Sequence, residues 1–476
     1  MWLHNRTRTA GSIGAVFAVV STVLILVGRI YFDEALPVAV VGVVVCTAMV
    51  AIVVRGGVNE GAARWTLLGT LVLFVALSPE IPVDIPVSVS RAFTLRLEDL
   101  LLLVVLLGWT VTLHRSDHVY LPPFAVPFAG YLAVALVVTV VGIGVYALPA
   151  ARAALYLLKE VQFLLFALLV ANLVKSRADV SVVVTAFIFG GVLNATWMAV
   201  QLATGDLGPL FHTVDIAKWR YGPSLLGQPS VLASAGFYLP PVFLTFGMLL
   251  YRTGHRVRII CCALLVAFLG SMMVTVSRAT IGATLFVLSV FTFGYAVRAT
   301  DRNVVAYFVA ALLAVIPFTV LNPLIVRRFL PQSVFSSIVS RLEIWNEFLA
   351  PPVPAMLVGF GKGSPGAVIG PAEAHNFYLR LLVETGIIGL VTFLLSIAVI
   401  LQTGVKLVVH SDDPLFRTVG TGTVGVTAAL LIVAIFQDVF INVKVAETFW
   451  LLIGMAGAVW RLYLDRQTDG TEPENV

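Results

Sequence analysis

Charged side chains are scarce in this sequence of 476 residues. Only 12% of the residues are Asp, Glu, Lys or Arg, whereas 59% are hydrophobic. Soluble domains carry about 25% charged residues, so the composition excludes a soluble globular protein. Apolar stretches recur along the whole chain, and those of about 18 residues or more are long enough to cross a hydrocarbon core of roughly 30 Å as a helix. The sequence therefore predicts an all-α polytopic membrane protein.

Cysteine and metal-binding patterns are also scarce. The three cysteines, at positions 46, 261 and 262, all fall inside predicted spans, where thiols usually act as small apolar groups. They indicate neither a disulfide framework nor a cysteine metal site. The loosely spaced His212, Asp206 and Asp215 are a weak metal triad. We therefore predict no metal site and no cofactor.

A nucleotide-binding loop is missing as well. The stretch VGFGKGS at 358–364 resembles one, but the Walker motif requires a glycine where Met356 stands and a Ser or Thr where Gly363 stands. The net charge of +5 suits cytoplasmic loops that lie against an anionic leaflet, and it gives no indication of nucleic acid.

The chain contains about fourteen candidate spans, or about twelve if the two short ones between 65 and 113 are not real. The first follows the basic leader MWLHNRTRT and is expected to stay in the mature protein, because it is long and has no small-residue cleavage site. The spans are 12–32, 36–54, 65–77, 98–113, 123–145, 155–173, 180–203, 229–251, 257–276, 280–298, 303–321, 376–404, 416–436 and 444–463.

The positions of Lys and Arg in short loops predict the orientation. One set of eight alternate segments is basic throughout, whereas turns on the other side, such as YFDEAL and QDVFIN, are acidic or nearly uncharged. Cytoplasmic loops carry the excess of Lys and Arg, so both termini are expected in the cytoplasm. We expect a single domain over 1–476 with three outward loops, 78–97, 204–228 and 322–375, and a disordered cytoplasmic tail at 464–476.

The outward side carries many cations that this rule does not explain, mostly in long loops or at span ends. An anionic ligand on that side would account for them. They are Arg91, Arg96, Arg152, Lys159, Lys218, Arg220, Arg278, Arg327, Arg328, Arg341, Lys362, Arg380 and Lys444.

Histidine is rare on the outward side, where only His212 and His375 are expected. His375 stands at the start of a span in the stretch AHNFYLRLLVETGIIGL, 374–390. At helical spacing His375 shares one face with two leucines, whereas Asn376, Arg380 and Glu384 form another at i, i+4 and i+8. A helix-entry residue without a chemical task is the plain interpretation of His375 alone, but ionisable groups inside a span favour a functional site.

Two further stretches carry outward arginines. Arg278 lies in the turn TVSRATIGA, 275–283, where an ordinary helix stop and start is an equally good explanation. Arg220 begins an irregular, Gly- and Pro-containing segment just before a span, and irregular backbone at membrane depth is tolerated where it lines a cavity. Arg220 is therefore a candidate phosphate ligand.

The segment 340–390 resembles the bacterial O-antigen ligase and Wzy-type O-antigen polymerase family. In that family an Arg and a Trp lead through a Pro to a Gly-x-Gly-x-Gly turn, a His-Asn-x-Tyr-Leu motif, a Glu and a Gly-x-x-Gly. The matching residues are Arg341, Trp345, Pro354, Gly359, Gly361, Gly363, His375, Asn376, Tyr378, Leu379, Glu384, Gly386 and Gly389. Weaker similarity extends back to 96–109, to the Ser-Arg pair at 277–278 and to the segment that begins at Arg220.

This resemblance implies a GT-C-type membrane glycosyltransferase in the bacterial cytoplasmic membrane, among membrane lipids and with its active site outward. Its donor would be a glycan on undecaprenyl pyrophosphate, and its acceptor a glycan, lipid or protein hydroxyl. In this picture Arg220 and Arg278 bind the diphosphate without a metal, and His375 is the general base. The loop 322–375 would cover the site with its amphipathic stretch.

The substrate-binding candidates are Arg341, Asn376, Tyr378, Arg380 and Glu384. Arg341 and Arg380 are equally well explained as structural partners of Glu343 and Glu384. Polymerase and ligase remain open alternatives, since these residues do not distinguish their acceptors. A transporter or flippase of lipid-linked glycans is the rival from another class, although it should show polar groups at both faces or repeated halves. A scaffold protein would need no such outward cations.

Overall fold

The computed structural model describes residues 61–77, 80–88, 91–96, parts of 99–109, 119–204, 235–320 and 330–469, with gaps at 253, 276, 299–301, 352 and 371–372. The predicted spans 12–32 and 36–54, most of 98–113 and the segment 205–234 lie outside the described residues.

The first half of the described chain contains helices and one hairpin. In chain order it has α3 (Gly61–Leu77), the strands β1 (Glu80–Ser88) and β2 (Arg91–Arg96), α5 (Ala125–Tyr146), α6 (Ala150–Leu173), α7 (Arg177–Thr204), α9 (Leu239–Tyr251) and α10 (His255–Val274).

Every regular element in the second half of the described chain is a helix. It contains α11 (Arg278–Arg298), α12 (Arg302–Val320), α14 (Pro331–Leu349), α15 (Val353–Val358), the π-helical turn η3 (Pro365–Ile369), α16 (Phe377–His410), α17 (Pro414–Ala434), the 3₁₀ turn η4 (Val439–Ile441) and α18 (Val443–Asp469).

Eight of these helices are long and apolar enough to cross a membrane, and three shorter apolar helices lie at 64–73, 235–251 and 305–317. The predicted all-α polytopic membrane protein is confirmed for the described residues, where the β1–β2 hairpin is an unpredicted addition. Its register is irregular around Pro86, which has no N–H to donate to the ladder. Helix α18 runs to Asp469, so the beginning of the predicted tail is helical, and 470–476 lies outside the described residues.

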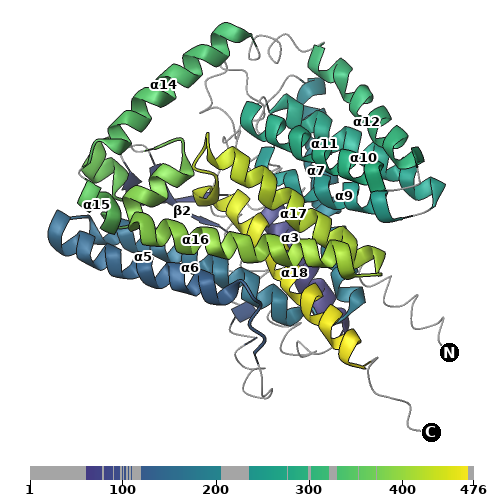
Figure 1. Ribbon diagram of the computed structural model, residues 1–476, viewed down its shortest axis with the longest axis horizontal. Helices are drawn as coiled ribbons and strands as arrows, with labels where there is room; N and C mark the ends of the chain where they lie inside the picture. The colour runs from purple at the N-terminus through teal and green to yellow at the C-terminus, as the bar shows by residue number, and fades with distance from the viewer. Residues whose placement is uncertain are drawn as a thin grey trace.

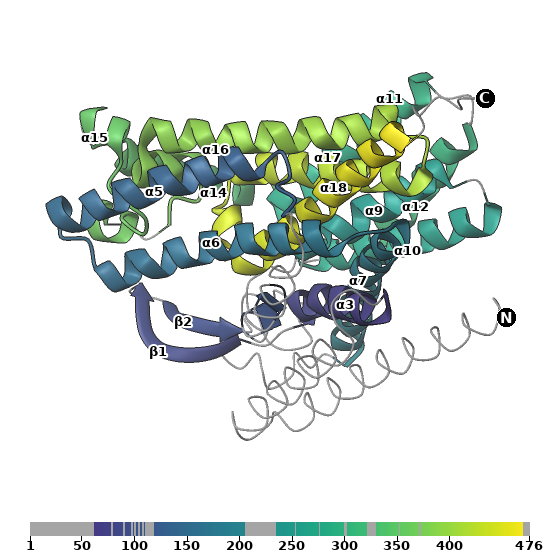
Figure 2. The same ribbon diagram turned by 90° about the horizontal axis from the view of Figure 1, so that it is seen from below.

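The helices form one bundle around α16, α17 and α18. Helix α16 packs against α5 and α17, α17 also packs against α9, and α18 packs against α6. Figures 1 and 2 both show α5, α6 and α16 running alongside one another, with the hairpin beside the start of α6. Aromatic contacts fill the space between them, including Phe128 of α5 against Trp450 of α18 with ring centroids 4.2 Å apart.

The bundle has two distinct ends. At one, called the α16 end here, α5 and α17 end while α6, α16 and α18 begin. At the opposite end, Asp413 caps α17 by accepting from the N–H of Leu415 at 2.9 Å. Its carboxylate is also 2.7 Å from Arg177 Nε of α7 and 3.2 Å from Arg466 of α18. Ion pairs therefore join three helices at the opposite end.

Helix α14 lies across the α16 end, away from the main bundle (Figure 1). One side of it is apolar and exposed, and the residues on this side recur at helical spacing: Phe335, Ile338, Val339, Leu342 and Leu349. The other side contacts the protein through Phe348, which is fully buried. The amphipathic helix predicted in the loop 322–375 is thus present.

Helix α16 is broken at Gly386, whose φ of 67° and ψ of −175° are not helical. The break removes the helical N–H donors of nearby carbonyl groups, and the loop before η3 supplies other N–H donors in their place. The N–H of Phe360 donates to Val383 O at 2.8 Å, and the N–H of Gly361 donates to Glu384 O at 2.9 Å. Unpaired backbone groups are costly in an apolar environment, so the break and the loop depend on each other.

Replacing Gly386 tests this dependence. An Ala Cβ would lie 2.4 Å from the carbonyl oxygen of Leu357 and would require a left-handed φ. We expect Gly386→Ala to destabilise the protein by about 1–3 kcal/mol or more, measured as a lower Tm in detergent. The control is Gly130→Ala in α5, where nothing lies within 4 Å. Equal Tm values for the two variants would contradict the coupling of break and loop.

Candidate functional site

The start of α16 holds His375 outside the helix. Asn376 is the N-cap, and its side chain accepts from the N–H groups of Tyr378 at 3.0 Å and Leu379 at 3.1 Å. His375 has a left-handed φ of 49°, so neither residue is helical. The predicted helical faces therefore began too early at His375 and Asn376, because the cap turns the chain before the first helical residue, whereas Arg380 and Glu384 do share a face and pair at i, i+4.

Two sequence-predicted substrate ligands are used inside the protein instead. The oxygen of the Asn376 side chain caps the helix, and the hydroxyl of Tyr378 donates to the carbonyl of Leu431 in α17 at 2.7 Å. The first contact caps α16 within its own first turn, and the second attaches that turn to α17.

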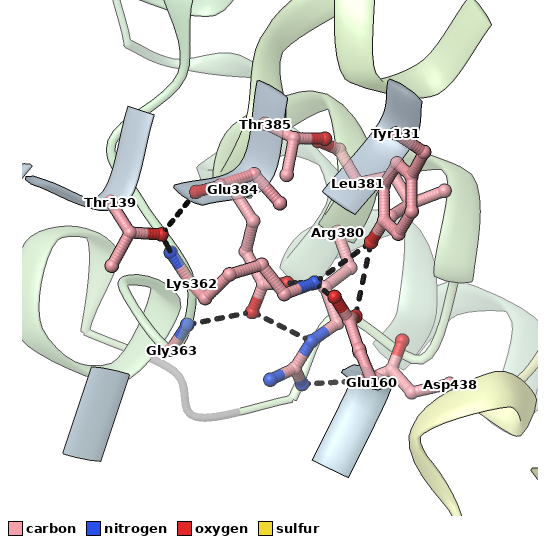
Figure 3. A network of polar contacts seen from close by, with 11 residues as sticks. Tyr131, Thr139, Glu160, Lys362, Gly363, Arg380, Leu381, Glu384, Thr385 and Asp438 are labelled. Carbon is pink, nitrogen blue, oxygen red and sulfur yellow. Dashed lines mark hydrogen bonds and ion pairs between the residues drawn. The ribbon is translucent and has the colours of Figure 1, made fainter. Parts of the chain in front are cut away.

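Lys362 lies at the centre of a buried ionic network (Figure 3). Its Nζ is 2.7 Å from Glu160 Oε1 of α6 and 2.7 Å from Glu384 Oε2 of α16, and it donates to the hydroxyl of Tyr131 at 3.2 Å. The side chain is 0% exposed. Burial alone would lower the pKa of Lys362, but the two carboxylates raise it above its ordinary value. This cation therefore stays charged and serves the protein's own carboxylates.

Three glycines allow the loop that carries Lys362 to approach this closely. Gly359, Gly361 and Gly363 all have positive φ, and a Cβ at Gly361 would lie 3.0 Å from the backbone of Thr139 in α5. The N–H of Lys362 donates to the Thr139 hydroxyl at 3.0 Å. The Gly-x-Gly-x-Gly segment is thus a docking turn that brings a lysine between α5, α6 and α16.

Arg380 continues the network toward the turn after α17. Its Nε is 3.0 Å from Glu384 Oε1, its Nη1 is 3.4 Å from Asp438 Oδ2, and its guanidinium lies over the ring of Tyr156 at 5.4 Å. The side chains of Arg380 and Glu384 are 2% and 0% exposed. This geometry favours the structural alternative for both residues, since each is enclosed by partners from the protein.

Asp438 is a residue that the sequence reading missed. It lies in the short acidic turn QDVFIN, which indicated only orientation. Burial raises the pKa of Asp438, while the charges of Arg380 and His375 lower it. The second carboxylate oxygen, Oδ1, is buried without a hydrogen-bond partner. The charge of His375 thus acts on a buried carboxylate, and Glu373 Oε2 lies 3.9 Å from its Nδ1.

Arg278 and Arg341 approach the same turn from two other elements. Arg278 begins α11, and the guanidinium of Arg341 on α14 lies 6.0 Å from the ring of Phe436, two residues before Asp438. The pKa of Arg341 is lowered by burial and by the positive charge of Arg278. Arg341 therefore lies beside the turn that holds Asp438, and the positive charge of Arg278 acts on it there.

Helix α14 is also attached to the histidine segment. The indole N–H of Trp345 donates to the carbonyl of Ala374 at 3.1 Å, so the helix that carries Arg341 is fixed next to His375. The structure brings together His375, Arg278 and Arg341 from the sequence-predicted set. Arg220 lies outside the described residues.

Other polar groups of the outward set are paired as well. Lys159 of α6 is 2.7 Å from Asp99, and Gln162 donates to the same carboxylate at 2.5 Å and to Glu447 at 3.2 Å. Over the described part of the chain, no group of three or more His, Cys, Asp and Glu side chains is arranged to hold a metal ion.

Comparison with known proteins gives one family. The profile of the family described as O-antigen ligase matches residues 263–394, which is less than a third of the chain. The match includes Arg278, Arg341, the glycine turn and the start of α16. No curated protein matches the sequence.

Removing the central cation tests the network. Lys362→Met would leave Glu160 and Glu384 buried without it, and breaking a buried pair costs about 3–5 kcal/mol. We expect a large drop in Tm in detergent. The control is Lys406→Met at the opposite end, where the ammonium lies 5.5 Å from the Trp460 ring, a contact of about 0.5–1 kcal/mol. A Lys362→Met protein as stable as the control would contradict the ionic role.

Proposed function

We propose, on the premise that residues 263–394 match the profile of the O-antigen ligase family, that the protein transfers a glycan from undecaprenyl pyrophosphate onto an acceptor hydroxyl. The family implies an enzyme of the glycosyltransferase type acting on a lipid-linked glycan. The donor lipid, the roles of individual residues and the choice between repeat-unit polymerase and ligase are parts of the proposal.

The observation that carries the proposal is the meeting of Arg278 and Arg341 beside His375. Two cations that repel each other are stabilised when an anion lies between them, and guanidinium groups bind phosphate oxygens in a bidentate way. A diphosphate has the charge and the oxygen spacing to satisfy both. Arg220, in the segment preceding α9, is proposed as a further ligand of the same group.

The proposed reaction is a displacement at C1 of the donor sugar. The acceptor oxygen forms a bond to C1 while the bond from C1 to the diphosphate oxygen breaks, and the electron pair leaves with the diphosphate. The arginines stabilise the charge that grows on this leaving group. His375 takes the proton of the acceptor hydroxyl.

Helix α14 suits a donor that carries a long hydrocarbon chain. Its exposed apolar side, from Phe335 to Leu349, would lie against lipid, while Arg341 and Trp345 face the site. Such an arrangement is typical of amphipathic helices at a membrane interface. We propose that α14 covers the diphosphate and guides the polyprenyl chain toward the bilayer.

An enzyme is favoured over a transporter by the opposite end of the bundle. There Asp413 joins Arg177 and Arg466, and Arg461 of α18 donates to the carbonyl of Val174 at 2.7 Å. Alternating access requires parts of a bundle to separate in turn at both faces, and these contacts oppose separation at this face. The α16 end is proposed to face outward from the bacterial cytoplasmic membrane, with both termini in the cytoplasm.

A reconstituted assay tests the function. Purified protein with a synthetic undecaprenyl-pyrophosphate glycan should form longer glycan if it is a polymerase, or an acceptor conjugate if it is a ligase, and should do so in chelator. We expect Arg278→Ala and His375→Ala each to lower the turnover about a hundredfold or more, because each removes a charge or a base from the reacting groups.

The controls are Arg256→Ala and His255→Ala at the other end of α10, which should keep full activity in folded protein. Full activity of both site variants, or turnover that depends on added divalent metal, would contradict the proposal. Movement of the donor across vesicle membranes without glycan transfer would favour the transporter.

A further inference from the structure

Arg380 is too deeply buried to touch a substrate, yet it contacts the site. Its side chain is 2% exposed, and protein groups surround its guanidinium: Glu384 at 3.0 Å, Asp438 at 3.4 Å and the ring of Tyr156 at 5.4 Å. Because the guanidinium is planar and its donors have fixed directions, these contacts define both its position and its orientation.

Stability alone is a weak explanation for this cluster. Lys362 and Arg380 contribute two positive charges, and Glu160, Glu384 and Asp438 contribute three negative ones when ionised. Replacing buried ion pairs by well-packed apolar residues is often neutral or stabilising. We therefore infer that the cluster fixes the position of a side chain in the site.

The network leads from the rigid centre of the bundle to the histidine. Lys362 is held between α5, α6 and α16, and it fixes Glu384 at 2.7 Å. The N–H of Gly363 donates to the other oxygen of Glu384 at 3.1 Å, and the same oxygen receives Arg380. Arg380 then reaches out of α16 to the turn after α17 (Figure 3). Asp438 stands at the end of this path, within range of the charge of His375.

We propose that Arg380 is a positioning residue of the transfer reaction: Glu384 and Tyr156 hold its guanidinium, and the guanidinium holds Asp438, as an anion, beside His375. The inference rests on the proposed function for its chemical meaning, since His375 is the proposed base. The effect of Arg380 on Asp438, which is to keep this buried carboxylate ionised and in place, can be tested without an activity assay.

The charges around Asp438 set the direction of the expected effect. Among the described residues the groups that act on it are Arg380 and Glu384 of α16, and His375 and Glu373 of the preceding segment. Burial raises the pKa of Asp438, whereas Arg380 and His375 lower it and the two glutamates raise it. Removing the cation at 380 must therefore raise the pKa of Asp438, so that its anionic form is lost at a higher pH.

Infrared titration of the purified protein measures this directly. The band of the protonated Asp438 carboxyl is assigned by its absence in Asp438→Asn, and its midpoint is followed against pH. We expect Arg380→Gln to move the midpoint to higher pH, and Arg380→Lys to move it less, because the charge remains but the fork is lost. If Arg380→Gln fails to fold, Arg380→Lys carries the test.

The matched control is Arg461→Gln in α18, whose guanidinium lies over Tyr120 at the opposite end. It should lower Tm without moving the midpoint. A midpoint in folded Arg380→Gln or Arg380→Lys that equals the wild type, or that falls, overturns the proposal.

Turnover provides the second measurement. In Arg380→Lys we expect kcat to fall about a hundredfold, as for a small misplacement of a catalytic group, with KM for the donor little changed and the acidic limb of the kcat profile moved to higher pH. A purely structural role would lower the active fraction and leave the pH profile in place. An inactive wild type would contradict the proposed function, while the infrared midpoint would still decide the role of Arg380.

Discussion

The burial of one ammonium group between two carboxylates organises this end of the molecule. Lys362 is carried by a loop, yet it is 0% exposed and lies 2.7 Å from Glu160 and from Glu384. An unpaired charge at that depth would be very unfavourable, so the loop cannot leave without exposing three charges to an apolar environment. The glycine turn, the break in α16 at Gly386 and the pairing of Arg380 all follow from this constraint.

The two ends of the bundle use charge in different ways. At the opposite end, Asp413 lies between Arg177 and Arg466, and the attraction between opposite charges joins three helices. At the α16 end, Arg278 and Arg341 repel each other next to a half-buried histidine. Opposite charges that meet stabilise a fold, whereas like charges that meet mark a place for a counter-ion. The proposed anion site is placed at the α16 end because of this asymmetry.

The polar residues near the start of α16 divide into two groups. Asn376, Tyr378, Arg380 and Glu384 are satisfied by the protein and build the support. His375 stands just before the helix, about a third exposed, because the cap turns the chain there. The left-handed φ of 49° at 375 keeps the histidine out of the helix, and its charge acts on Asp438 in the turn after α17.

The sequence by itself determined the class of protein, most span positions and the resemblance to the O-antigen ligase family. These follow from local composition and spacing, since about 18 apolar residues cross a membrane whatever their neighbours are and the motif around His375 is contiguous. The sequence also offered His375 and Arg278 as candidates for the site. It could not distinguish residues that would bind substrate from residues that pair inside the protein. Arg380 and Lys362 look like any other outward cations when only their side of the membrane is known.

Only the tertiary structure decided those roles. Lys362 and Glu160 are far apart in the chain, and so are Arg380 and Asp438, so their pairing depends on how α6, α16 and α17 pack. Asp438 gave no sequence signal beyond an acidic turn. A charge acquires its function from the charges that the fold places within a few ångströms of it, and that distance is a property of packing, which no local pattern of residues contains.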